Sequence, residues 1–191
     1  MRPDGVGLLL LTGGRGNRMG TPKHGLAHPE GGTWGGHLVR TFACLWPEGP
    51  LLLLGEPLPD HPHLPVFEDP RQGPAVALRL WCAAPAPPAH RWWVVACDLV
   101  RWTPAGLAAW AERVEAADPG AEHWVMAEHG GHLQPLGGFL PGRLRPALAS
   151  AQGASLHALA RGVPHLVLPA EGGEWLDLDT PADRRAFEAE P

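Results

Sequence analysis

The chain has no tyrosine, only three cysteines and no long run of apolar residues. Cys44, Cys82 and Cys97 are widely spaced, form no CxxC pair and leave an odd thiol in any disulfide scheme. We therefore expect reduced, mostly buried thiols in a cytoplasmic protein. The apolar runs are far shorter than the ~20 residues of a membrane span, so we expect no membrane partner. The first run, Val6–Leu11, follows Met1 without the charged region of a signal peptide, and we interpret it as a strand.

Charge is also sparse. Charged residues make up 18% of the 191 positions, the net charge is -5, and no block of like charge stands out. The basic excess of a protein that grips nucleic acid is absent, so we predict no nucleic-acid partner. A bound nucleotide would need a local cationic site. Lys23 is the single lysine among 15 basic residues. Either the genome favours arginine codons, or one site needs a compact ammonium that a planar guanidinium cannot replace.

Short apolar runs alternate along the chain with segments of helical periodicity. Strands are predicted at 6–11, 51–54, 66–67, 92–96, 124–127, 136–140 and 165–168, and helices at 37–46, 74–84, 104–116, 144–151, 155–161 and 182–189. Thr103 is the predicted N-cap of the helix at 104–116, with Pro104 at its first position. This alternation predicts an α/β fold, a three-layer sandwich with a mainly parallel sheet. The length and the 45% hydrophobic content predict one domain over residues 1–191.

The segment from Leu11 to Lys23 carries the strongest chemical signal. A buried strand runs into a loop with four glycines, two arginines and the lone lysine. Glycines let backbone N–H groups approach phosphate oxygens, and the cations supply charge for a triphosphate. The loop is not a Walker A motif, because no Ser or Thr follows a GK pair, and its glycine spacing does not fit G-x-G-x-x-G. A flexible basic loop is the simpler alternative.

The whole segment resembles the signature of the molybdenum cofactor guanylyltransferases (MobA), roughly L-A-G-G-x-S-x-R-M-G-x-D-K. The matching positions are Leu11, Gly13, Gly14, Arg18, Met19, Gly20 and Lys23. The sequence departs from the signature at Gly16 and at Pro22. The resemblance implies a Rossmann-like nucleotide-binding half at about 1–103 and an acceptor half at about 104–191. It also implies a nucleotide-contacting set of Leu11, Thr12, Gly13 and Gly14, and a catalytic pair of Arg18 and Lys23 that neutralises the phosphates.

Two further segments extend the resemblance. Glu68-Asp69 and Gly73-Pro74-Ala75 look like the family's E-D and G-P-L-A segments, which implies that Asp69 and Gly73 lie at the nucleoside. Val95-Ala96-Cys97-Asp98 looks like the family's strand ending in C-D. A carboxylate at the carboxyl end of a parallel strand is well placed to hold Mg²⁺ against phosphates, so we predict Asp98 as the metal ligand and a catalytic residue. Turn and capping roles are the alternatives for both aspartates.

The acceptor side is identified by weaker segments. Gln134-Pro135-Leu136 resembles Q-P-L of the guanylyltransferases, and Asp177-Leu178-Asp179-Thr180-Pro181 resembles their N-x-N-T-P. The resemblance implies acceptor contacts at Gln134, Asp177 and Asp179, with Asp179 as a candidate second metal ligand. The simpler interpretation is that Asp179 and Thr180 begin a helix. The aspartates, and Thr21-Pro22-Lys23, look more like the molybdopterin cytidylyltransferases (MocA).

The resemblance therefore implies a Mg²⁺-dependent transfer of GMP from GTP to molybdopterin, with release of pyrophosphate. Cytidylyl transfer to molybdopterin, nucleotidyl transfer to a sugar or polyol phosphate, and a non-catalytic nucleotide-binding module remain open. The resemblance also implies transient contact with molybdenum cofactor delivery proteins. Of the eleven histidines, we considered His61 with His63 and His129 with His132 as close pairs, and we interpret both as loop histidines rather than zinc ligands.

Overall fold

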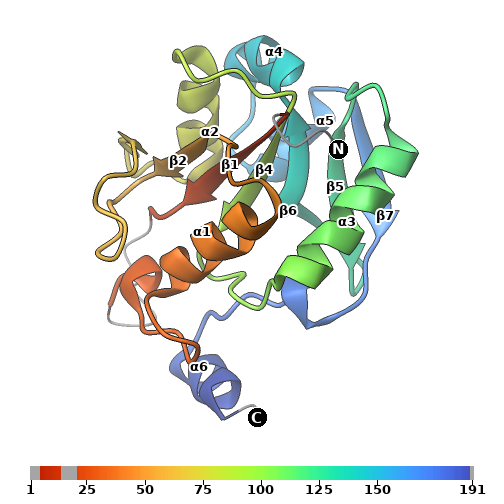
Figure 1. Ribbon diagram of the computed structural model, residues 1–191. Coiled ribbons are helices and arrows are strands. Elements are labelled where there is room, and N and C mark those ends of the chain that lie inside the picture. The colour runs from red at the N-terminus through yellow and green to blue at the C-terminus, as the bar shows by residue number, and fades with distance from the viewer. Residues whose placement is uncertain (1–4, 14–20, 190–191) are drawn as a thin grey trace.

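A seven-stranded sheet forms the centre of the molecule (Figure 1). The computed structural model describes residues 5–13 and 21–189. The strands are β1 (Val6–Leu11), β2 (Leu51–Leu54), β3 (Val66–Phe67), β4 (Arg91–Ala96), β5 (Trp124–His129), β6 (His132–Pro141) and β7 (His165–Pro169). Their order is β3-β2-β1-β4-β6-β5-β7, and only β6 among them pairs antiparallel with its neighbours.

Helices cover both faces of this sheet. They are α1 (Trp34–Leu45), α2 (Pro74–Ala83), α3 (Pro104–Ala117), α4 (Arg145–Ser150), α5 (Leu156–Arg161) and α6 (Pro181–Glu188), with 3-10 turns η1 (Lys23–Gly25), η2 (Gly142–Leu144) and η3 (Gly173–Trp175). The helices α1 and α3 pack together on one face, whereas α2 contacts α4 and α5 on the other. The predicted α/β sandwich with a mainly parallel sheet is confirmed.

Strand alternation divides the apolar residues between two cores. In β1, Leu8 and Leu10 point to the core under α1 and α3, while Leu9 and Leu11 point to the core under α2, α4 and α5. The adjacent Trp92 and Trp93 of β4 divide in the same way, and neither has exposed surface. Because every residue of β1 is buried, its sequence is a continuous apolar run, as parallel strands covered on both faces require.

Side-chain caps set where several helices begin. Thr33 accepts a hydrogen bond from the amide of Gly36, so α1 begins at Trp34 rather than at the predicted His37. Thr103 caps α3 as predicted, and Thr180 forms a capping box with Asp183 at α6.

The strand β6 is longer than the segment 136–140 predicted for it. It spans ten residues, pairs with β5 through a short turn at His129–His132, and also pairs with β4. Apolar periodicity cannot show this reversal of direction, because both directions bury alternate residues equally well.

A buried ion pair anchors the start of β4. Arg91 has no exposed surface, and its Nη1 lies 3.0 Å from Asp118 Oδ2 at the end of α3. Its Nη2 donates to the Asp118 carbonyl oxygen. The same carboxylate accepts from the amides of Glu122 and His123. These contacts tie β4 to the connection between α3 and β5.

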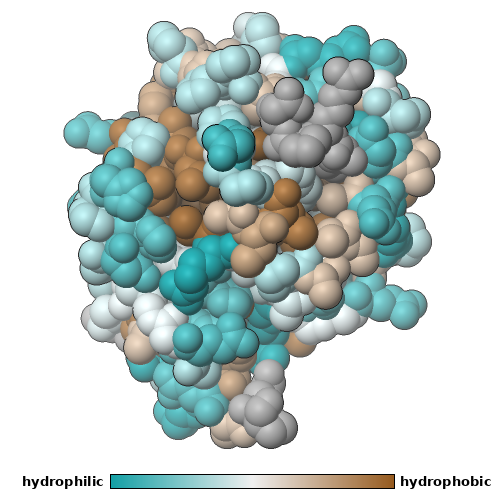
Figure 2. All heavy atoms as spheres, viewed as in Figure 1, coloured by the Kyte–Doolittle hydropathy of each residue, from teal (hydrophilic) through white to brown (hydrophobic). Residues whose placement is uncertain are grey.

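Figure 2 shows how hydrophobic and hydrophilic side chains are distributed on one face of the molecule. In Figure 2, hydrophobic side chains gather towards the centre of the view and hydrophilic ones surround them. Within residues 5–13 and 21–189, no helix combines the length and the apolar character that crossing a bilayer requires.

Candidate active site

A cavity of about 1000 Å³ opens at the carboxyl ends of β1, β2 and β4. These strands end level with one another, because Leu11 pairs with both Leu54 and Ala96. Open α/β sheets bind ligands at this edge, where loops leave the strands. The volume suits a nucleotide and part of a second substrate.

Beside the cavity, the chain that follows β1 and β2 packs too closely for a side chain at two glycines. A Cβ on Gly13 would lie 2.2 Å from Asp69 Oδ2, and a Cβ on Gly55 would lie 2.2 Å from the Gly13 nitrogen. Gly55 also has φ of 135°, which L side chains rarely adopt. The ends of β1 and β2 and the Asp69 carboxylate therefore meet at glycine-only contacts.

The ammonium of Lys23 lies between two carboxylates. Its Nζ is 3.0 Å from Asp98 Oδ2 and 2.5 Å from Asp179 Oδ1. Asp98 directly follows Cys97 after β4, and Asp179 immediately precedes the N-cap of α6. The Leu178 amide donates to the Asp98 carbonyl oxygen at 3.2 Å, and this backbone contact brings the two aspartates together.

This site holds more negative than positive charge among the described residues. Burial alone would lower the pKa of Lys23, but its interactions with Asp98 and Asp179 outweigh burial and raise that pKa. Burial, and then the charges of Asp179 and Asp98, raise the pKa of Asp177. Three carboxylates around one lysine therefore suit a hard divalent cation, which prefers oxygen ligands.

Three residues that line the cavity, Glu56, Arg71 and His24, were not found by the sequence analysis. Thr12 Oγ1 donates to the Glu56 carbonyl oxygen at 2.7 Å, and the Glu56 side chain pairs with Arg71 at 2.7 Å. His24 is buried beside them, and burial lowers its pKa. These residues follow strands or turns without a motif of their own, so only the fold brings them to the cavity.

The structure brings most of the predicted nucleotide residues to this one cavity. Its lining includes Leu11, Thr12, Gly13, Lys23, Asp69, Gly73 and Asp98. Gly14 and Arg18 lie outside the described residues. Asp179 contacts Lys23, and Asp177 is close enough for its pKa to respond to Asp98. Gln134 lies in β6 opposite Ala127, and it is not part of the described lining.

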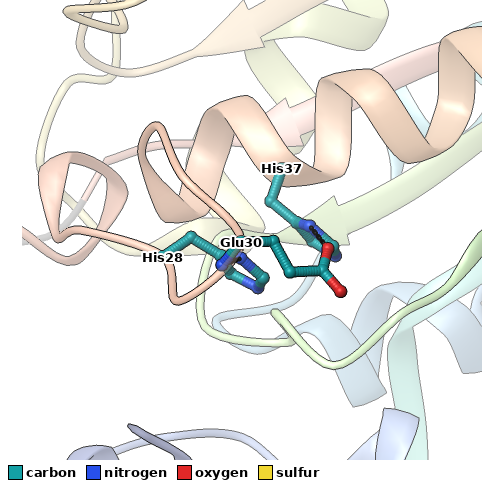
Figure 3. Close-up of side chains that lie close together, drawn as sticks. All are labelled: His28, Glu30 and His37. Carbon is teal, nitrogen blue, oxygen red and sulfur yellow. Dashed lines mark hydrogen bonds and ion pairs between the residues drawn. The ribbon is translucent and has the colours of Figure 1, made fainter.

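The histidines and cysteines differ in part from the sequence interpretation. His61 and His63 have ring centroids 6.1 Å apart, and His129 hydrogen-bonds to the Ala170 carbonyl oxygen. The sequence analysis missed a third group, in which ligand atoms of His28, Glu30 and His37 lie within 4.8 Å of one another (Figure 3). Cys82 and Cys97 are buried thiols as expected, whereas Cys44 is exposed.

Residues 8–167 match the model of the MobA-like NTP transferase domain. The chain belongs to this family. The match covers β1, the cavity loops, β4 and most of the remaining sheet. Members of this family act on nucleoside triphosphates, so the chain is an NTP transferase by membership. No curated protein matches the chain significantly in sequence.

Solved structures share the fold over nearly the whole chain. Rv0371c from Mycobacterium tuberculosis has a TM-score of 0.70 and 24% identity, covering 98% of this chain and 100% of that one. A second structure of Rv0371c, in complex with manganese, has a TM-score of 0.65 and 21% identity, covering 98% and 99%. Molybdopterin-guanine dinucleotide biosynthesis protein A from Archaeoglobus fulgidus has a TM-score of 0.68 and 13% identity, covering 95% of this chain and 96% of that one. The 2-C-methyl-D-erythritol 4-phosphate cytidylyltransferase from Thermus thermophilus has a TM-score of 0.69 and 16% identity, covering 97% of this chain and 98% of that one.

Proposed function

We propose that this MobA-like transferase moves GMP from GTP to molybdopterin, releases pyrophosphate and forms the molybdopterin guanine dinucleotide cofactor. The observation that carries the proposal is the Lys23 ammonium held between Asp98 and Asp179 beside the cavity. One cation and two carboxylates at this edge of the sheet can position a triphosphate and its metal. The Gly-Gly, Gly-Pro-Ala and Gln-Pro-Leu segments favour guanylyl transfer to molybdopterin.

The reaction needs no covalent nucleophile from the protein. The terminal phosphate of the acceptor attacks the α-phosphorus of GTP, and the bond to the departing pyrophosphate breaks in line. Lys23 donates hydrogen bonds to phosphate oxygens on the leaving side, because its raised pKa keeps it charged at neutral pH. The family resemblance gives Arg18 the same task. Such preorganised cations contribute about 10²–10³ in rate.

The carboxylates fit the Mg²⁺ that this reaction requires. We assign Asp98 as a metal ligand and Asp179 as its partner, since both are within 3.0 Å of Lys23 Nζ. Bound Mg²⁺ would neutralise the phosphate oxygens as charge develops. The manganese complex of Rv0371c supports a divalent metal in a structure of this fold.

The acceptor half is assigned to residues of about 104–191. The Lys23–Asp179 ion pair and the electrostatic interaction of Asp177 with Lys23 support our assignment of both aspartates as acceptor contacts near the reacting phosphate. Gln134 is proposed as an acceptor contact on the resemblance of Gln134-Pro135-Leu136 alone. Molybdopterin delivery by transient contact with other proteins is part of the same proposal.

The test is pyrophosphate release by purified protein with Mg²⁺ and molybdopterin, comparing GTP, CTP, ATP and UTP. We expect release with GTP, lost in Lys23→Ala and Asp98→Ala. A matched control is Glu112→Gln, which changes an exposed carboxylate of α3 and should keep full activity. Equal activity of all three variants with wild type would contradict the site assignment.

Cytidylyl transfer to molybdopterin is the second candidate, favoured by one observation. Asp177 and Asp179 stand where the guanylyltransferases have asparagines, and both lie at the Lys23 site. Release with CTP alone would select this candidate. Release only with a sugar or polyol phosphate would change the acceptor, and tight nucleotide binding without any release would indicate a non-catalytic module.

A further inference from the structure

Two charged side chains form an ion pair at the β3 end of the cavity. Glu56 follows β2, Arg71 follows β3, and both line the cavity together with Asp98, which follows β4. Arg71 Nη2 donates to Glu56 Oε1 at 2.7 Å. The phosphate chemistry assigned to Lys23 and Asp98 does not use this pair, which leaves it available to another part of the nucleotide.

The order of the strands sets the distance between this pair and the phosphate site. Leu54 of β2 and Ala96 of β4 both pair with Leu11 of β1. Glu56 and Asp98 each lie two residues beyond that level. Because β2 and β4 flank β1, two strand intervals, about 10 Å, separate them. This separation is comparable to the length of a nucleoside monophosphate, so a nucleotide with its α-phosphate beside Asp98 brings its base to the ion pair.

The backbone of Glu56 is fixed to the end of β1. The Thr12 hydroxyl donates to the Glu56 carbonyl oxygen at 2.7 Å and accepts from the Glu56 amide at 2.9 Å. Thr12 itself is 1% exposed. The Glu56 side chain therefore extends from a fixed point of the cavity wall, and little backbone ordering remains for a ligand to pay for.

The backbone of Arg71 adopts an uncommon conformation. Its φ is 59°, in the left-handed region that favours glycine. The Arg71 amide donates to Asp69 Oδ1 at 2.8 Å, which holds this turn beside Gly13. The Arg71 and Glu56 side chains are 65% and 44% exposed, and exposed ion pairs add little to folding stability. Backbone strain of this kind is concentrated at ligand-binding sites, so the turn points to a ligand contact.

Guanine is the base whose hydrogen-bonding edge matches this pair. Its Watson–Crick edge carries two adjacent donors, N1–H and the N2 amino group, followed by the acceptor O6. A carboxylate accepts from both donors, and a guanidinium beside it donates to O6. Cytosine and adenine each present one amino donor next to an acceptor nitrogen, so a carboxylate would meet one donor and one lone pair.

We propose that Glu56 and Arg71 select guanine, with Glu56 accepting from N1–H and the N2 amino group and Arg71 donating to O6. This inference rests on the proposed guanylyl transfer and names the residues that choose its nucleotide. A guanidinium has five N–H donors, so Arg71 can hold Glu56 and O6 together. Neither residue contacts the reacting phosphates, and their substitution changes nucleotide choice rather than the chemical step.

The test is calorimetric binding of nucleotides to the full chain with Mg²⁺ and without molybdopterin. The probes are GTP, inosine triphosphate, which lacks the N2 amino group, xanthosine triphosphate, which carries a carbonyl oxygen at C2, and CTP. Wild type should bind GTP about tenfold more tightly than inosine triphosphate, because one hydrogen bond to a charged group is lost.

Glu56→Gln should weaken GTP binding about tenfold and bind xanthosine triphosphate more tightly than wild type does. The glutamine amide donates to the C2 oxygen, while its carbonyl still accepts from N1–H. Arg71→Gln should weaken GTP and inosine triphosphate by the same factor, because both keep O6. The control is Glu122→Gln, which alters an exposed ion pair with Arg143 outside the described lining and should bind all four nucleotides as wild type does.

A purely structural role for the ion pair would weaken all four nucleotides equally in Glu56→Gln. That result, or an unchanged ratio of GTP to inosine triphosphate affinity in this variant, would overturn the inference while leaving guanylyl transfer intact. Tighter binding of CTP than of GTP by wild type would instead contradict guanylyl transfer, and this inference with it.

Discussion

Replacement of Asp118 by asparagine tests how the start of β4 is held. The substitution keeps the side-chain shape but removes the charge that faces Arg91, whose side chain has no exposed surface. Asp118 itself is 4% exposed and accepts hydrogen bonds from Arg91 and from the amides of Glu122 and His123. The buried guanidinium would then keep only the partly exposed Glu115 carboxylate, 3.9 Å from its Nε, as a counter-charge. Removing one partner of a buried ion pair commonly costs about 3–5 kcal/mol.

The pKa of Asp118 gives a second measure of the same interaction. Burial alone would raise this pKa, but hydrogen bonds from His123, Glu122 and Arg91 outweigh burial and lower it from 3.8 to about 2. At about 1.4 kcal/mol per unit, the charged form is favoured in the folded state by about 2 kcal/mol. We therefore expect Asp118→Asn to lower the free energy of unfolding by about 2–4 kcal/mol, and the melting temperature by roughly 5–15 °C.

The assay is urea unfolding followed by tryptophan fluorescence across pH. Because the folded-state pKa is lowered, the contribution of Asp118 is fully present above pH 3.8 and is lost as pH falls through about 2. The difference between wild type and variant should therefore shrink over this window. Glu122→Gln is the control, since its ion pair with Arg143 is more than half exposed and should change stability by less than about 1 kcal/mol. A loss below about 0.5 kcal/mol for Asp118→Asn at pH 7 would refute the reasoning.

Three further predictions concern the candidate active site. Lys23→Met should lower the rate of nucleotidyl transfer about 10²–10³-fold. Lys23→Arg should not restore the rate, because a planar guanidinium cannot occupy the space between Asp98 and Asp179. Measurements of kcat check both variants. Gly55→Ala should raise the KM for the nucleotide and destabilise the fold by about 1–3 kcal/mol, because the new Cβ would meet the Gly13 nitrogen at 2.2 Å. Nucleotide titration measures the effect on KM, and urea unfolding measures the loss of stability. Removal of divalent metal with EDTA should abolish turnover, and added Mg²⁺ or Mn²⁺ should restore it; full activity after chelation would count against a metal at Asp98.

Local sequence patterns account for the elements that surround the cavity. The apolar run of β1 and the Thr103-Pro104 start of α3 each depend on neighbouring residues, and both are found where predicted. The direction of β6 depends instead on which strands it lies between, and the start of α1 depends on a cap that follows glycines.

Long-range contacts explain what the sequence could not predict. Lys23 and Asp98 were proposed from motifs, but the contact of Lys23 with Asp179 joins residues 156 positions apart. The stacking of His28 on His37 arises because a hairpin folds back on a helix, and the spacing of these histidines matches no metal motif. Such pairings are set by tertiary packing, so only the folded chain displays them.

The most direct test of nucleotidyl transfer follows the label of the nucleotide. Purified protein with Mg²⁺ and molybdopterin should transfer ³²P from [α-³²P]GTP to the acceptor and release ³²P from [γ-³²P]GTP as pyrophosphate. Asp98→Asn should abolish both events, while Glu112→Gln should leave both intact. Release of the γ-label as orthophosphate, with no α-label on any acceptor, would show hydrolysis instead and contradict the account.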